Sequence, residues 1–179
     1  LHGTDITLVG SHPFYRPAVT FSINHSDCVT AVSESLKQDT LRLFDIKTDI
    51  KVIPTFIDAN KLNNKDKPCE RSLLAPETDR IITHISNFRP LKRIFDVIDI
   101  FEKISLEVSS RLLMVGEGPE KSSAIAYVNS KDLKNKVLFL GNSNEIDKIL
   151  CYSDVFLLPS EMESFGLVAL EAMANGVPV

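Results

Sequence analysis

Two glutamates near the end of the sequence stand where they could bind a ligand. Glu163 and Glu171 are separated by seven residues, and Glu171 is the only charged residue between Leu167 and Val179. Each helical step turns about 100°, so two helical residues at this spacing would point roughly 80° apart. The pattern favours Glu163 in a loop and Glu171 on the following helix, with the two carboxylates holding different parts of one long ligand. A solvated surface position for either glutamate is the alternative.

The segment around Glu163, residues 159–167, leads from an apolar run into an apolar helical pattern. A helix N-terminus offers unpaired N–H groups and a positive dipole end, and Gly166 lets a ligand approach the backbone closely. In open α/β sheets such strand-to-helix turns lie at the ligand-binding edge.

A basic group follows another apolar run. Arg89, Lys92 and Arg93 lie within five residues, next to Pro90, which suits a first helical turn. Cations at a helix N-terminus oppose the helix dipole, so stability alone does not explain them. An anion docked between the helix end and these side chains would explain them. A solvated basic face is the alternative, and Arg93 fits it.

Gly116 and Gly118 give a weaker signal. Lys121 stands where a G-x-G-x-x-G fingerprint needs its third glycine, and no acidic residue follows at the expected distance. The pair therefore predicts a tight loop beside a ligand rather than a dinucleotide site.

The elements that must position these residues alternate between strand and helix. Apolar runs without alternation predict buried strands at residues 81–85, 112–115, 137–140 and 155–158. Helical periodicity covers residues 94–104 and 167–174. Strands alternating with helices predict a doubly wound α/β fold with parallel sheets.

The first half repeats this pattern in shorter form. Residues 27–32 and 50–53 are predicted strands, and Ser33 is the predicted N-cap of a helix that ends at Phe44. A polar stretch then interrupts the apolar rhythm. It divides the sequence into a domain at residues 1–57, a connector at 58–76 and a domain at 77–179.

The composition is that of an ordinary globular chain. The 179 residues are 44% hydrophobic and 25% charged, with 20 Lys and Arg against 24 Asp and Glu, a net charge of −4. This excludes a disordered chain and argues against a nucleic-acid binder. No apolar stretch approaches the roughly 20 residues of a membrane span.

The three cysteines, Cys28, Cys69 and Cys151, are far apart and form no CxxC pair, which predicts reduced thiols in a cytoplasmic protein and no zinc site. Residues 1–4 look like a strand end and residues 177–179 like a strand start, so the chain is expected to be a piece of a longer protein.

Taken together, these stretches resemble a known enzyme family. Residues 163–178, ESFGLVALEAMANGVP, resemble the E-x7-E signature of the retaining GT-B glycosyltransferases of family four, which includes sucrose and trehalose-type synthases. The stretches HGTDITLVG, DCVTAVS and HISNFRPLKR are similar to a subgroup that moves N-acetylglucosamine from UDP-GlcNAc to L-malate in bacillithiol biosynthesis. The resemblance implies two Rossmann-like domains: the end of an acceptor domain at 1–57 and a truncated donor domain at 77–179.

The resemblance also implies roles for single residues. Glu171 would bind the ribose of UDP, and Glu163 would orient the transferred sugar without forming a covalent bond to it. Further donor contacts would come from Asn87, Gly116, Gly118, Phe165, Gly166 and Leu167. Arg89 and Lys92 would neutralise the diphosphate, although related enzymes commonly carry Gly-Arg where this chain has Ser86-Asn87. His2 would face the donor sugar, and Thr4 and Arg16 would meet the acceptor carboxylates.

The implied mechanism needs no metal and no cofactor. The malate hydroxyl would attack from the face that the phosphate leaves, and the departing phosphate would accept the proton. The resemblance implies small-molecule substrates only, no nucleic acid or membrane span, and is compatible with a homo-oligomer. The isolated piece is expected to be inactive. A different acceptor (a sugar, lipid or polyol) and a non-catalytic nucleotide-binding or interaction module are the alternatives.

Overall fold

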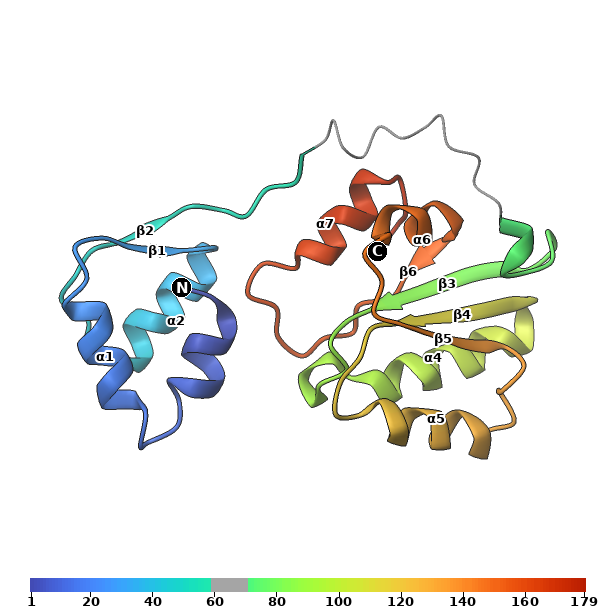
Figure 1. The fold of residues 1–179 in the computed structure, drawn as a ribbon, viewed down its shortest axis with the longest axis horizontal. Coiled ribbons are helices and arrows are strands. Elements are labelled where there is room, and N and C mark those ends of the chain that lie inside the picture. The colour runs from blue at the N-terminus through green and yellow to red at the C-terminus, as the bar shows by residue number, and fades with distance from the viewer. Residues whose placement is uncertain (59–70) are drawn as a thin grey trace. The chain divides into compact units, whose positions relative to one another are not determined.

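The computed structural model describes residues 1–58 and 71–179 (Figure 1). Two compact units make up the chain: Leu1–Phe56 with Glu163–Leu167, and Ile57–Met162 with Val168–Val179. Most of the predicted connector lies outside the described residues, and the predicted domain limits stay a prediction.

The first unit contains a small parallel sheet. Strand β1 (Val29–Ala31) pairs with β2 (Ile50–Val52), and η1 (Thr4–Val9), α1 (Arg16–Asn24) and α2 (Glu34–Leu43) complete the unit. Side chains from all five elements or their ends form its core, including Ile6, Ile23, Val29, Leu36 and Ile50.

Local signals set the ends of these elements. The hydroxyl of Ser33 accepts a hydrogen bond from the Leu36 amide at 3.2 Å, which confirms the predicted N-cap of α2. The predicted strand end at residues 1–4 is wrong, because Thr4 begins a π-helix that buries Ile6 completely. A four-residue stretch is too short to distinguish the two periods.

The second unit is built on a four-stranded sheet with the order β5-β4-β3-β6. All neighbours are parallel, with β3 at Arg80–Ile85, β4 at Ser110–Val115, β5 at Val137–Gly141 and β6 at Val155–Phe156. The parallel α/β fold predicted from the apolar runs is therefore confirmed, although β6 is shorter than expected.

Helices cover both faces of this sheet (Figure 1). Helices α4 (Ile94–Glu107) and α5 (Lys121–Ser130) lie on one face, and α6 (Ile146–Tyr152) and α7 (Leu167–Ala174) on the other. Alternate strand residues point to opposite faces. Accordingly Leu112 and Met114 pack in the core with α4 and α5, whereas Leu113 and Val115 pack with α6 and α7.

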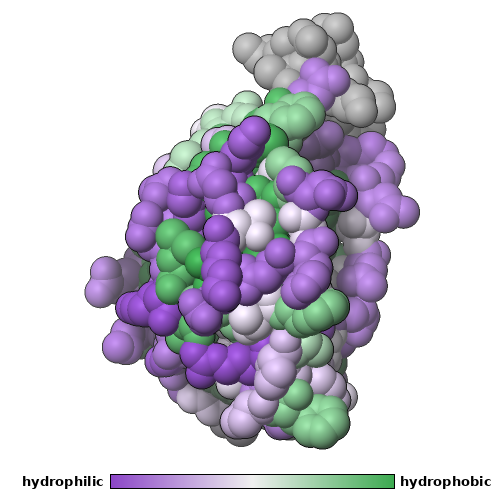
Figure 2. Space-filling view, turned by 90° about the vertical axis from the view of Figure 1, so that its left-hand side faces the viewer, coloured by the Kyte–Doolittle hydropathy of each residue, from purple (hydrophilic) through white to green (hydrophobic). Residues whose placement is uncertain are grey.

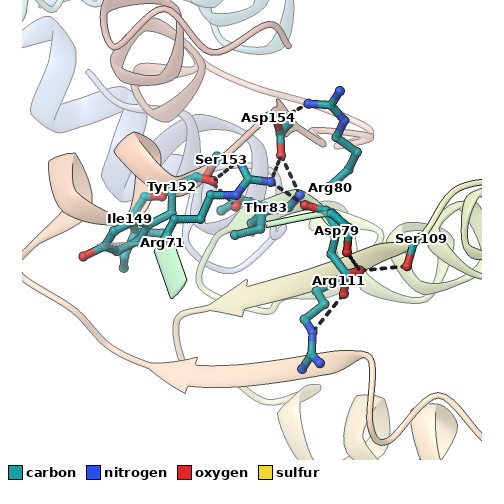
Figure 3. A network of polar contacts seen from close by, with 12 residues as sticks. Arg71, Asp79, Arg80, Thr83, Ser109, Arg111, Ile149, Tyr152, Ser153 and Asp154 are labelled. Atoms are coloured by element: carbon teal, nitrogen blue, oxygen red, sulfur yellow. Dashed lines mark hydrogen bonds and ion pairs between the residues drawn. The ribbon is translucent and has the colours of Figure 1, made fainter. Parts of the chain in front are cut away.

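A network of ion pairs closes the amino-terminal edge of the sheet (Figure 3). The Asp154 carboxylate accepts hydrogen bonds from Arg71 and from the Ile81 amide, both at 2.7 Å, and from Arg80 at 3.1 Å. Burial alone would raise the pKa of Asp154, but these hydrogen bonds outweigh it and hold the pKa below its ordinary value. The segment that precedes β3 is thereby fastened to the residue that precedes β6.

A second carboxylate at this edge joins the start of β3 to the start of β4. Asp79 accepts hydrogen bonds from Ser109 at 2.7 Å and from Arg111 at 3.3 Å (Figure 3). The Ser109 hydrogen bond, together with Arg111, lowers the pKa of Asp79. Asp79 and Asp154 are thus both paired with donors within the protein.

The cysteines differ from the sequence-based expectation. Cys28 is exposed and free, whereas Cys151 is disulfide-bonded, so the prediction of reduced thiols is wrong for Cys151. Cys69 lies outside the described residues. Spacing along the chain could not reveal this bond, because pairing depends on distances that only the fold sets.

One face of the molecule is mostly polar. Figure 2 shows one face on which hydrophilic side chains surround separate hydrophobic groups. Among the helices within residues 1–58 and 71–179, none is both long and apolar enough to cross a bilayer.

The Asp154 network leads to a stability prediction. Asp154→Asn removes the charge that two guanidinium groups share, so we expect the free energy of unfolding at neutral pH to fall by about 1–3 kcal/mol. The lowered pKa means that this contribution is complete above the unfolded pKa of about 3.9 and is lost as the pH falls through the folded value. Urea denaturation of the full-length protein measures both effects.

Glu145→Gln is the matched control. It breaks the exposed pair between Glu145 and Lys148, whose side chains are 62% and 49% exposed. We expect no resolvable change in the free energy of unfolding, because water and salt screen an exposed pair. An equal loss in the two variants would mean that the Asp154 network is no more than a surface ion pair.

Candidate functional site

The carboxyl ends of β3 and β4 meet at a loop contact that needs glycine. A Cβ atom on Gly116 would lie 1.8 Å from the Ser86 carbonyl oxygen, and one on Gly118 would lie 2.0 Å from that of Asn87. Gly116 also has a φ of 125°, which L side chains rarely adopt. These glycines therefore let the two loops touch, and their predicted contact with a nucleotide stays a prediction.

The basic residues lie on a tight turn after β3. Arg89 precedes the 3-10 helix η3 (Pro90–Lys92), and both Arg89 and Lys92 are half-buried. We call residues 89–92 the basic turn. Arg93 instead adopts a left-handed conformation and pairs with Asp96 at 2.7 Å, in keeping with its assignment to the solvated face.

The basic turn is fastened to the loop that follows β6. The Glu161 amide donates a hydrogen bond to the Leu91 carbonyl at 2.9 Å. Parallel strands end at the same edge of a sheet, and this bond joins two of the loops there. The two cationic side chains therefore lie at the carboxyl-terminal edge, where open α/β sheets bind their ligands.

Glu171 differs from Asp79 and Asp154, because its pKa is raised rather than lowered. Its half-buried side chain lies on α7. Among the described residues, no group donates a hydrogen bond to its carboxylate or forms an ion pair with it. Burial raises the pKa of Glu171, and the negative charge of Asp147 on α6 raises it further. A partly buried acid with a raised pKa and no protein partner is a candidate for ligand contact.

Several predicted residues belong to the first unit. Glu163, Phe165 and Gly166 are grouped with residues 1–56, whereas Glu171 is in the second unit. Gly166 has a φ of 78° just before α7. Whether the two glutamates meet on one ligand therefore stays a prediction.

The predicted acceptor residues lie near the N-terminus. His2 and Thr4 are exposed, and Thr4 begins η1. The guanidinium of Arg16 donates to the Leu43 carbonyl and lies over the Phe44 ring, 5.6 Å from its centre. Arg16 therefore has contacts within the unit, and its role in acceptor binding stays a prediction.

Sequence patterns alone missed two neighbours of the site. The negative charge of Asp147 raises the pKa of Glu171, and the Leu91 carbonyl accepts the hydrogen bond from the Glu161 amide. Neither residue type signals such a role in one sequence. Across the described ranges, no group of three or more His, Cys, Asp or Glu side chains could hold a metal ion.

Two protein-family models match the sequence. The family model for glycosyl transferases group 1 matches residues 67–179. The chain belongs to this family. A second family model, Glycosyltransferase Family 4, matches residues 1–61 of this glycosyltransferase.

Individual relatives match nearly the whole chain. The N-acetyl-alpha-D-glucosaminyl L-malate synthase of Bacillus anthracis is 45% identical over 179 residues, 99% of this chain and 47% of that protein. An uncharacterized glycosyltransferase of Methanocaldococcus jannaschii is 30% identical over 171 residues, 90% of this chain and 44% of that protein. The chain thus spans about half the length of the curated relatives it matches.

Solved structures share the fold. The Anabaena protein HepE, crystallised in complex with UDP and glucose, has a TM-score of 0.79 and 23% identity, covering 92% of this chain and 46% of its own. This likeness shows that the glycosyltransferase has the GT-B type of fold.

The raised pKa of Glu171 leads to a prediction for nucleotide binding. If its carboxylate accepts hydrogen bonds from ligand hydroxyls, UDP must bind more weakly as the pH falls through that pKa. We expect Asp147→Asn to move this loss of affinity to lower pH, because it removes the like charge. Calorimetric titration of the full-length protein with UDP between roughly pH 4.5 and 7 measures the shift.

Glu171→Gln serves as the control, because the amide cannot titrate. The affinity of the Glu171→Gln variant for UDP should change with pH only as the UDP phosphates titrate. A pH profile identical to that of the unmodified protein would remove Glu171 from the binding site.

Proposed function

We propose that this chain is part of a retaining glycosyltransferase that moves N-acetylglucosamine from UDP-GlcNAc to L-malate, the first step of bacillithiol synthesis. The observation that carries the proposal is the basic turn, held by Glu161 at the carboxyl-terminal edge of the sheet. The 45% identity to an L-malate synthase supports the choice of donor and acceptor.

The basic turn would stabilise the leaving group. When the bond to the sugar breaks, positive charge develops on the anomeric carbon and negative charge on the β-phosphate of UDP. Arg89 and Lys92 would neutralise the diphosphate, with a hydrogen bond from Asn87. Charge that appears only in the transition state is where such groups accelerate a reaction.

The nucleoside would be held by the neighbouring elements. Glu171 would accept hydrogen bonds from the ribose hydroxyls, which fits a half-buried carboxylate with a raised pKa. Gly116 and Gly118 would line the pocket. Backbone N–H groups at Phe165, Gly166 and Leu167 would help Glu163 to hold the hydroxyls of the transferred sugar.

The acceptor would meet residues of the first unit. His2 would face the donor sugar, while Thr4 and Arg16 would bind the carboxylates of malate. The malate hydroxyl would attack from the face that UDP leaves, and a phosphate oxygen would take its proton, so the configuration is retained. Glu163 would orient the sugar without becoming a nucleophile, and the reaction would take place in the cytoplasm.

The acceptor is tested by the mass of the product. The full-length protein is incubated with UDP-GlcNAc and, in separate reactions, L-malate, a sugar, a lipid and a polyol. Transfer to malate supports the proposal, whereas transfer to another acceptor replaces malate. No transfer from any mixture would favour a non-catalytic nucleotide-binding module. The 179-residue piece itself should show negligible turnover, because it spans about half of its relatives.

Removing one cation of the basic turn tests the phosphate site. We expect Lys92→Ala to lower kcat by at least about 100-fold, by analogy with the loss of other groups that stabilise transition-state charge. Steady-state rates with UDP-GlcNAc and the identified acceptor measure the effect.

Arg93→Gln is the neighbouring control. It removes an exposed cation that pairs with Asp96, so kcat should change by less than about threefold. An undiminished rate in the Lys92 variant would exclude the assignment of the diphosphate to the basic turn.

A further inference from the structure

A buried histidine joins the ends of two strands, close in sequence to the basic turn. His84 lies on β3 and is 0% exposed. Its Nδ1 atom is 2.8 Å from the Leu157 carbonyl oxygen, just after β6. Since a carbonyl oxygen can only accept, Nδ1 carries the proton and donates it to Leu157.

The other ring nitrogen contacts the loop after β3. Nε2 of His84 is 2.8 Å from the Ser86 hydroxyl, which also lies 3.3 Å from the Phe88 amide. A neutral ring with its proton on Nδ1 makes Nε2 an acceptor. Ser86 then donates to Nε2 and accepts from the Phe88 amide, so one protonation state satisfies the ring, the hydroxyl and the amide together.

Phe88 connects this chain of hydrogen bonds to the basic turn. Its φ is 37°, an unusual value for a residue other than glycine, and its side chain is completely buried. The ring stacks on His84 at 6.4 Å and meets Phe139 edge-on at 6.4 Å. Strained backbone persists where its surroundings fix it, and such sites often carry function. The next residue is Arg89, the first of the basic turn.

We propose that His84 is a positioning residue for the basic turn. Through Ser86 it fixes the strained backbone at Phe88, and through Leu157 it ties that backbone to the strand whose loop holds Leu91. The side chain touches no substrate, and its effect reaches the diphosphate only through Arg89 and Lys92. This inference rests on the proposed function.

Binding of UDP to the full-length protein tests the inference. Ser86→Ala removes the hydroxyl that joins His84 to Phe88, and we expect the Kd for UDP to rise about tenfold. Ser86→Thr keeps a hydroxyl and should restore most of the affinity. His84→Gln removes the stacked ring and should weaken binding at least as much as Ser86→Ala.

The control is Thr83→Val on the same strand. Thr83 is also 0% exposed, and its hydroxyl bonds that of Ser153 at 2.6 Å. The variant loses a buried hydrogen bond without touching the basic turn. Urea denaturation compares its stability with that of Ser86→Ala, and its Kd for UDP should stay within about twofold of the unmodified value.

Two further measurements separate positioning from simple destabilisation. Combining Ser86→Ala with Lys92→Ala should cost less affinity than the sum of the single losses, because both changes act on one turn. Nitrogen-15 chemical shifts of His84 at neutral pH should show a protonated Nδ1 and an unprotonated Nε2.

The outcomes are distinct. An unmodified protein that does not bind UDP overturns the proposed function and this inference with it. If the unmodified protein binds UDP, then equal affinities for Ser86→Ala and Thr83→Val, strictly additive losses, or a proton on Nε2 of His84 overturn the inference alone.

Discussion

Parallel pairing of β3, β4, β5 and β6 is the constraint on which the second unit depends. A parallel sheet needs helices on both faces, so each strand must be apolar on both sides and each must be followed by a crossover. The same geometry brings all carboxyl ends of the strands to one edge. Loops that are far apart in the sequence, such as those containing Leu91 and Glu161, meet there.

The two edges of this sheet handle charge differently. At the amino-terminal edge, Asp79 and Asp154 are bonded by arginines and by other donors, and their pKa values are lowered. Near the opposite edge, the pKa of Glu171 is raised, and no described side chain compensates its charge. The paired acids Asp79 and Asp154 stabilise the fold. A partly buried carboxylate without a paired cation, such as Glu171, lowers the free energy of unfolding instead.

Close packing of loops explains why the carboxyl-terminal edge can hold a defined shape. Gly116 and Gly118 allow one loop to press against the backbone of Ser86 and Asn87. His84 and Phe88, just before the basic turn in the sequence, are completely buried and their rings stack on each other. The cationic side chains therefore start from a backbone that is fixed before any ligand binds, which lowers the entropy lost on binding.

The sequence by itself determined the fold class, the four strands and the helices α4 and α7 of the second unit. Buried strands need continuous apolar runs and α4 needs a 3.6-residue period, and both signals are local. It also singled out Arg89, Lys92 and Glu171 as candidates for ligand contact, because charge beside a strand end or within an apolar helix is unusual.

Only the tertiary structure decided how these residues are supported. The hydrogen bonds of His84, the charge of Asp147 near Glu171, the disulfide at Cys151 and the arginine partners of Asp154 all join segments far apart in the chain. No local pattern encodes such contacts, because each depends on the distance between side chains that the folded backbone alone brings together.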